Sequence, residues 1–149
     1  MLYVKEGKIH SKYCSFALPE DWFFFYSSGV EVEDGFELSK YEDSESVRMN
    51  IGVQYFRPLS SLEALNDSKE FVSMSEIFPV SRGGLKGKAL FYHSLSWDRE
   101  YYEEHLELGS DKVLEFFLAC DVTAKTKGKI KDILNDPSVV GCLSSIQAK

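Results

Sequence analysis

The chain has 149 residues, a length that suits one domain, and its 44% hydrophobic residues exclude global disorder. Ten glycines and four prolines without a short repeat exclude collagen-like and other repetitive classes. The formal net charge is −7, whereas nucleic-acid binders and proteins that dock on anionic membranes need a basic face. We therefore expect one domain over residues 1–149 that binds neither nucleic acid nor a membrane.

The cysteines point to a reducing compartment. The chain contains Cys14, Cys120 and Cys142, an odd number without regular spacing, which is not typical of a disulfide framework. Cys120 lies in an apolar run and Cys142 on an apolar helix stripe, so we expect both to be buried. The first ten residues contain no apolar stretch long enough for a signal peptide. The predicted location is the cytoplasm.

The first half of the chain reads mainly as strands. Residues 8–18 predict a first strand, residues 22–26 a short aromatic strand and residues 35–41 a third. The clearest pattern covers residues 47–56, where apolar and polar residues alternate with period two, as in a strand with one buried face. Pro58 ends this strand because proline cannot donate to the ladder.

The next predicted element is a helix over residues 61–74. Ser60 and Glu63 have the spacing of a capping box at its start. Residues 81–84, Ser-Arg-Gly-Gly, then predict a turn before the next strand.

Three further strands follow, over residues 86–97, 99–108 and 113–122, joined by tight turns. The last is apolar on both faces except at Glu115 and Asp121. A strand of that kind lies in the centre of a sheet and is covered on both sides.

The C-terminus reads as helical. Residues 124–135 predict one helix, and a second begins with Asp136 as N-cap and Pro137 in the first turn. Its apolar residues recur at helical spacing, and we expect its Leu143 and Ile146 to be core residues; the stripe is Val139, Val140, Leu143 and Ile146. The expected fold class is α+β: a largely antiparallel sheet flanked by helices on both faces, an α/β/α sandwich.

Four stretches in this order resemble a known fold family. They are Phe-Ala-Leu-Pro-Glu-Asp-Trp at 16–22, Pro-Leu-Ser-Ser-Leu-Glu at 58–63, the glycine-led strand at 83–92 and the closing helix at 140–146. Together they resemble the fold shared by the photosystem extrinsic protein PsbP and the Ran-binding Mog protein, whose bacterial relatives include chaperones of type VI secretion effectors. The resemblance implies a PsbP-like domain with a binding role rather than a reaction, and no functional residue is carried over.

Two features suggest a surface for a protein partner. Seven carboxylates and one lysine occupy residues 31–45, and five aromatic residues occupy 22–26. Each feature has a plainer interpretation: a solvated acidic loop, and an aromatic strand covered by helices on both faces. The candidate partner-binding residues are Glu31, Glu33, Asp34, Glu37, Trp22, Phe24 and Tyr26.

Catalytic and metal-binding patterns are weak in this sequence. His93 and His105 lie on strands that a hairpin would pair, and with Glu103 or Glu104 they could bind a metal. We favour two half-buried strand histidines, and expect no metal and no cofactor. Glu103 and Glu104 are adjacent on a strand, so they point to opposite faces.

The sequence therefore favours a non-enzymatic protein-binding or adaptor module, a monomer or weak dimer whose partner is another protein. The alternative is a small-molecule-binding domain or an enzyme with a cleft. The residues expected to line such a cleft are Tyr55, Tyr92, His93, Tyr101 and His105.

Overall fold

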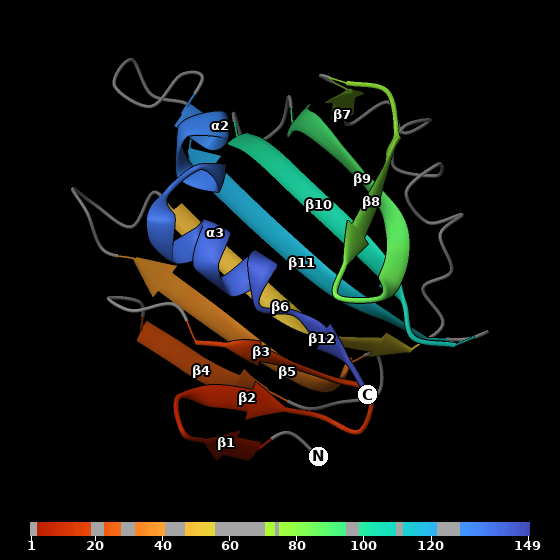
Figure 1. Cartoon of the computed structure of the whole chain (residues 1–149). Helices are drawn as coiled ribbons and strands as arrows, with labels where there is room; N and C mark the ends of the chain where they lie inside the picture. Colours follow the sequence, from red (N-terminus) through yellow and green to blue (C-terminus); the bar gives the residue numbers. More distant parts are fainter. Residues whose placement is uncertain are drawn as a thin grey trace.

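The structure of the chain is a computed structural model (Figure 1). It describes residues 3–18, 23–27, 32–40, 47–55, 71–73, 75–94, 99–109, 112–121 and 129–149. The helix predicted over 61–74 lies outside these residues except at 71–73, which form a strand. The strands are β1 (Tyr3–Lys5), β2 (Lys8–His10), β3 (Cys14–Ala17), β4 (Phe23–Ser27), β5 (Val32–Lys40), β6 (Val47–Tyr55), β7 (Phe71–Ser73), β8 (Phe78–Arg82), β9 (Leu85–Ser94), β10 (Arg99–Glu107), β11 (Lys112–Asp121) and β12 (Gln147–Ala148), and the helices are α2 (Lys129–Leu134) and α3 (Pro137–Ser144).

Eight of the described strands form one antiparallel sheet. Its order is β4-β5-β6-β11-β10-β9-β7, and β8 also pairs with β9. The predicted period-two strand is confirmed as β6, which pairs with β5 on one side and with β11, far along the sequence, on the other. The two hairpins predicted around β10 are confirmed, since β10 pairs with both β9 and β11.

A second, smaller sheet joins the two ends of the described chain. Its order is β1-β2-β3-β12, again antiparallel. The single strand expected at 8–18 is wrong, because a turn at Ser11 separates β2 from β3. The Ser11 hydroxyl accepts a hydrogen bond from the Tyr13 amide at 3.1 Å, as in an ST-turn, and another from the Cys14 amide at 3.0 Å.

The predicted α/β/α sandwich is wrong. The fold consists mainly of two antiparallel sheets, and the helices do not flank the large sheet on both faces. Among the residues that the structure describes, α2 and α3 lie on the same side of the large sheet as the small sheet (Figure 1). The small sheet therefore lies on a face of the large sheet where the sequence predicted only helices.

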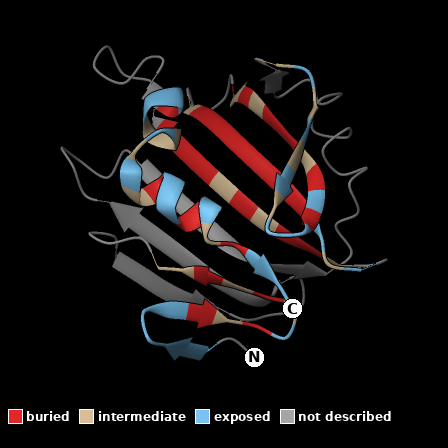
Figure 2. Cartoon of the chain, in the orientation of Figure 1, coloured by how far each residue is buried: buried red, intermediate tan, exposed pale blue. Residues whose placement is uncertain are grey.

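The main core fills the space between the two sheets. Ile9 and Phe16 from the small sheet pack in one cluster with Tyr102 and Phe116 from the large sheet. The helices contribute to this core as well: Leu143 of α3 belongs to it and is 3% exposed. Figure 2 shows that buried residues run along β10 and β11.

The central strand of the large sheet is buried on both faces, as its sequence predicted. In β11, Leu114, Phe116 and Leu118 belong to the main core, while Ala119 belongs to a second cluster with Leu90. The faces alternate because successive side chains of a strand point in opposite directions. The second face of the sheet therefore also carries buried residues, although Glu115 on that face is 17% exposed.

Helix α3 begins as the sequence predicted. The Asp136 side chain accepts a hydrogen bond from the Ser138 amide at 3.0 Å, and Pro137 follows in the first turn. The helix buries Val139 and Leu143, but Val140 is 42% exposed and does not belong to the core. Ile146 is buried as expected, although α3 ends before it, at Ser144.

Candidate functional site

Five of the seven candidate partner-binding residues lie on two neighbouring strands. Phe24 and Tyr26 lie in β4, and Glu33, Asp34 and Glu37 lie in β5. The strands pair with Phe25 opposite Glu37, and β4 stands at the end of the order of described strands in the large sheet. Trp22 and Glu31 lie outside the described residues.

The acidic strand is irregular where its carboxylates are densest. The register between β5 and β6 shifts between Val32 and Asp34, as in a β-bulge that contains Glu33. The remaining acidic residues of the segment, at 42, 43 and 45, lie outside the described residues.

The structure separates the two histidines that the sequence analysis brought together. Ser94 pairs with Arg99 across the β9–β10 hairpin, so the partner of His105 is Lys88 and the partner of His93 is Glu100. Register partners share a face, and residues 93 and 88 on the same strand point to opposite faces. A site containing both His93 and His105 is therefore wrong.

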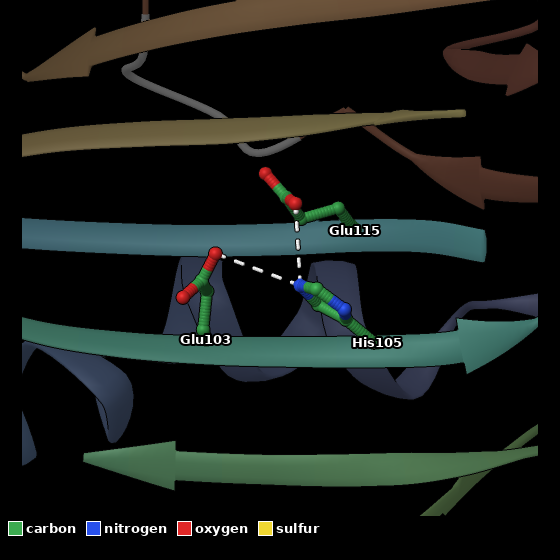
Figure 3. Close-up of side chains that lie close together, drawn as sticks. All are labelled: Glu103, His105 and Glu115. Carbon is green, nitrogen blue, oxygen red and sulfur yellow. Dashed lines mark ion pairs between the residues drawn. The ribbon is translucent and has the colours of Figure 1, made fainter. Parts of the chain in front are cut away.

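His105 instead meets two carboxylates on the second face of the large sheet (Figure 3). Glu103 is two residues away on β10, and Glu115 is the register partner of His105 on β11. The His105 Nε2 atom lies 3.5 Å from Glu103 Oε1 and 3.2 Å from Glu115 Oε2. We call these three residues the His105 cluster, and it is the one group of potential metal ligands found among the described residues.

The cluster is buried to different degrees. The exposed fraction of the side chain is 2% for His105, 9% for Glu103 and 17% for Glu115. Burial lowers the pKa of His105, but the facing carboxylates of Glu103 and Glu115 raise it more, to about 9. In this arrangement the imidazole is protonated at neutral pH.

Tyr92 holds the cluster from the neighbouring strand. Its hydroxyl donates a hydrogen bond to Glu103 Oε2 at 3.0 Å, leaving Oε1 of the same carboxylate directed at His105. The Tyr92 ring stacks on Tyr101 with a centroid separation of 4.8 Å. Burial and the neighbouring Glu103 raise the pKa of Tyr92 above its usual range, so it stays a donor.

The residues expected to line a cleft are brought to one face of the sheet only in part. Tyr92, Tyr101 and His105 share one face of the sheet, whereas His93 lies on the other. Tyr55 lies at the end of β6, opposite Lys112 in register.

The opposite face carries a separate buried carboxylate. Glu104 is 0% exposed, and its Oε1 lies 2.5 Å from Arg82 Nη2. It also accepts a hydrogen bond from the Tyr102 hydroxyl. Burial raises the pKa of nearby Cys142 to about 12, and Glu104 adds to the shift. We assign this group a structural role, because a guanidinium balances the carboxylate within the main core.

Glu115 was not among the candidate site residues predicted from the sequence. The signal that could have found it was the polar interruption of an otherwise apolar strand at 113–122. Its partner was not visible in the sequence, because the pairing of Glu115 with His105 depends on the length of the β10–β11 turn.

Comparisons with known proteins show a fold but no family. No family model matches the chain, and no curated protein matches it significantly. The structure is similar to that of LpqN, a Mycobacterium tuberculosis protein involved in cell envelope biogenesis, with a TM-score of 0.58 and 10% sequence identity over 91% of this chain and 83% of LpqN. A structure from Bacteroides thetaiotaomicron has a TM-score of 0.46 at 11% identity, and the match covers 99% of this chain and 48% of the other.

The likeness to LpqN shows a related, β-rich fold. The finer assignment to a PsbP-like family has no support from a family match. The described helices, α2 and α3, are both too short to cross a membrane.

Proposed function

We propose that the chain is a non-enzymatic protein-binding module of the PsbP-like family, and that its partner docks at strand β4. The observation that carries this proposal is the pairing of β4 with β5, with Phe25 opposite Glu37. Two features that the sequence offered separately, an aromatic run and an acidic segment, are therefore neighbours at one edge of the described sheet.

The strand order supports recognition of an extended partner segment. Among the described strands, β4 pairs with β5 alone. An edge strand presents backbone N–H and C=O groups that can pair with another chain, and several peptide-binding domains accept a ligand strand in this way. Aromatic residues, which make up most of β4, are enriched at the cores of protein interfaces.

The charge supports a basic partner. Glu33, Asp34 and Glu37 would complement Lys or Arg side chains and steer the approach of the partner electrostatically. Such steering weakens with salt, because the Debye length shrinks to roughly 8 Å at physiological ionic strength.

The comparison with LpqN supports a related fold for this module but gives no evidence about its function. LpqN is involved in cell envelope biogenesis, but at 10% identity only the fold is transferred. For the compartment we keep the sequence-based prediction, the cytoplasm.

The test is affinity capture with the tagged full chain from a native lysate, quantified by mass spectrometry. The test variant replaces Glu33, Asp34 and Glu37 together by Ser. The control variant replaces Glu76, Glu107 and Asp132 by Ser; these residues are exposed, and the net charge changes by the same amount.

We expect the test variant to lose the basic partners that the wild-type chain and the control variant retain. Recovery by the wild-type chain falls as the salt concentration rises from low to physiological values. The same set of partners for both variants, with no effect of salt, would contradict the proposal.

A further inference from the structure

The His105 cluster brings three donor atoms together from two adjacent strands. One atom each from Glu103, His105 and Glu115 lies within 4.8 Å of the others. All three residues belong to β10 and β11, whose backbones are paired along their whole lengths. Donors carried on central strands keep their positions better than donors carried on loops.

The spacing of the donors suits a small metal ion. Bonds of about 2.1 Å at tetrahedral angles put neighbouring ligand atoms about 3.4 Å apart. The His105 Nε2 atom lies 3.2 Å from Glu115 Oε2 and 3.5 Å from Glu103 Oε1. The three donor atoms lie within 4.8 Å of one another, so an ion seated between them would draw the two carboxylates closer together.

Tyr92 orients one of the donors from outside the cluster. It holds Glu103 Oε2 by a 3.0 Å hydrogen bond and so directs Oε1 at His105 (Figure 3 shows this orientation of Glu103). Hydrogen bonds of this kind to metal-binding carboxylates fix their orientation. The arrangement thus contains both the ligands and a group that positions one of them.

The buried carboxylates on the two faces of the large sheet have different partners. On the main-core face, Glu104 is paired with the guanidinium of Arg82. On the second face, two carboxylates converge on an imidazole, a group that binds metals in its neutral form. Burying carboxylates costs free energy, which the protonated imidazole of His105 offsets in the absence of a metal. A divalent cation that displaces this proton would offset the same cost in its place.

We propose that Glu103, His105 and Glu115 bind a divalent transition-metal ion, for which zinc is the best match. The nitrogen ligand favours such an ion over Mg²⁺ and Ca²⁺, which prefer oxygen ligands alone. Three protein ligands leave a fourth position for water or another ligand, as in open zinc sites. This proposal replaces the sequence-based expectation of no metal, and it is independent of partner docking at β4.

The experiment uses the full chain, stripped of metal with a chelator. Zn²⁺ is titrated in by calorimetry and Co²⁺ by visible absorption, which reports the ligand geometry. We expect one ion per chain, together with a rise in the unfolding temperature in excess Zn²⁺, since a ligand that binds the folded state stabilises it.

Substitutions assign the site to the cluster. We expect His105→Gln and Glu115→Gln each to weaken Zn²⁺ binding by more than about tenfold, because each removes a ligand. Tyr92→Phe keeps all three ligands but loses the orienting hydrogen bond, and should weaken binding by about 10–100-fold. The matched controls, His93→Gln on the opposite face and the exposed Glu107→Gln on the same strand, should bind as the wild-type chain does.

Folding of each variant is checked by circular dichroism. If His105→Gln fails to fold, Glu115→Gln decides, because its side chain is the most exposed of the three at 17%. Absence of stoichiometric Zn²⁺ and Co²⁺ binding by the folded wild-type chain would overturn the proposal. So would equal affinity in Glu115→Gln and His93→Gln.

Discussion

Leu143 joins α3 to the core between the two sheets. It is 3% exposed and packs in the cluster that includes Phe16 and Phe116. Replacing Leu143 by Ala removes buried methyl groups and leaves a cavity, so we expect a loss of about 2–5 kcal/mol in the free energy of unfolding. Urea unfolding measures this loss.

The control for this prediction is Val140→Ala in the same helix. Val140 is 42% exposed, so its truncation should cost well under about 1 kcal/mol. Equal losses for the two variants would mean that α3 is not docked through Leu143.

Cys142 provides a second prediction at the residue scale. Burial raises the pKa of its thiol to about 12, so at pH 8 it is almost entirely protonated. The thiolate is the reactive form, and Cys14 and Cys120 are buried too. We therefore expect an aromatic disulfide reagent to react slowly with the folded chain. In denaturant, it should react with all three thiols at once. Rapid reaction of one thiol under native conditions would contradict this burial.

The burial of some residues could be predicted from the sequence, whereas the contacts of others could not. Burial of Cys120, Cys142 and Leu143 followed from apolar patterning, which reports the environment of a residue within its own element. The contacts of His105 depend instead on the register of two hairpins. Register is set by turn length, and a shift of one residue exchanges the faces of a strand.

The N-cap of α3 gives a prediction at the scale of the element. Asp136 accepts hydrogen bonds from the Ser138 amide at 3.0 Å and from the Ser138 hydroxyl at 2.6 Å. Asp136→Ala should therefore lower the free energy of unfolding by about 0.5–2 kcal/mol. The exposed Asp132 of α2 serves as control. Asp132→Ala should change the free energy of unfolding by less than about 0.5 kcal/mol.

Long strands could be predicted from the sequence, and very short ones could not. β6, β10 and β11 have nine or ten residues each, enough for a periodic pattern to appear. β1 and β12 have three and two residues, all exposed, so neither composition nor alternation marks them. Their pairing with β2 and β3 makes them strands, and that is a tertiary contact.

This limit explains the error in the fold class of the whole molecule. Sequence patterns predict one strand near the start of the chain and a helix at its end. In the structure, β12 follows α3 and pairs with β3, which builds a second sheet from residues far apart in sequence. Nothing local indicates that pairing, whereas the antiparallel character of the large sheet followed from its tight turns.

Gly83 gives a prediction about the contact between the two sheets. It lies in the turn between β8 and β9 with φ of +51°, and its carbonyl accepts a hydrogen bond from the Ala148 amide of β12 at 2.9 Å. A Cβ added there would lie 1.8 Å from the Ile146 carbonyl oxygen. Gly83→Ala should therefore destabilise the fold by more than about 1 kcal/mol in urea unfolding.

Gly109 is the matched control, because a Cβ there would meet nothing within 4 Å. Gly109→Ala should leave the free energy of unfolding within about 1 kcal/mol of the wild-type value. If Gly83→Ala were equally harmless, the close contact between the β8–β9 turn and β12 would be wrong.

The central functional claim is that a protein partner docks at the β4 edge of the large sheet. The most direct measurement is hydrogen–deuterium exchange of the full chain with and without the captured partner. We expect the amides of β4, residues 23–27, to gain protection on binding, while those of β1, the edge of the small sheet, exchange unchanged. Unchanged exchange in β4, with protection elsewhere in the chain, would contradict the claim.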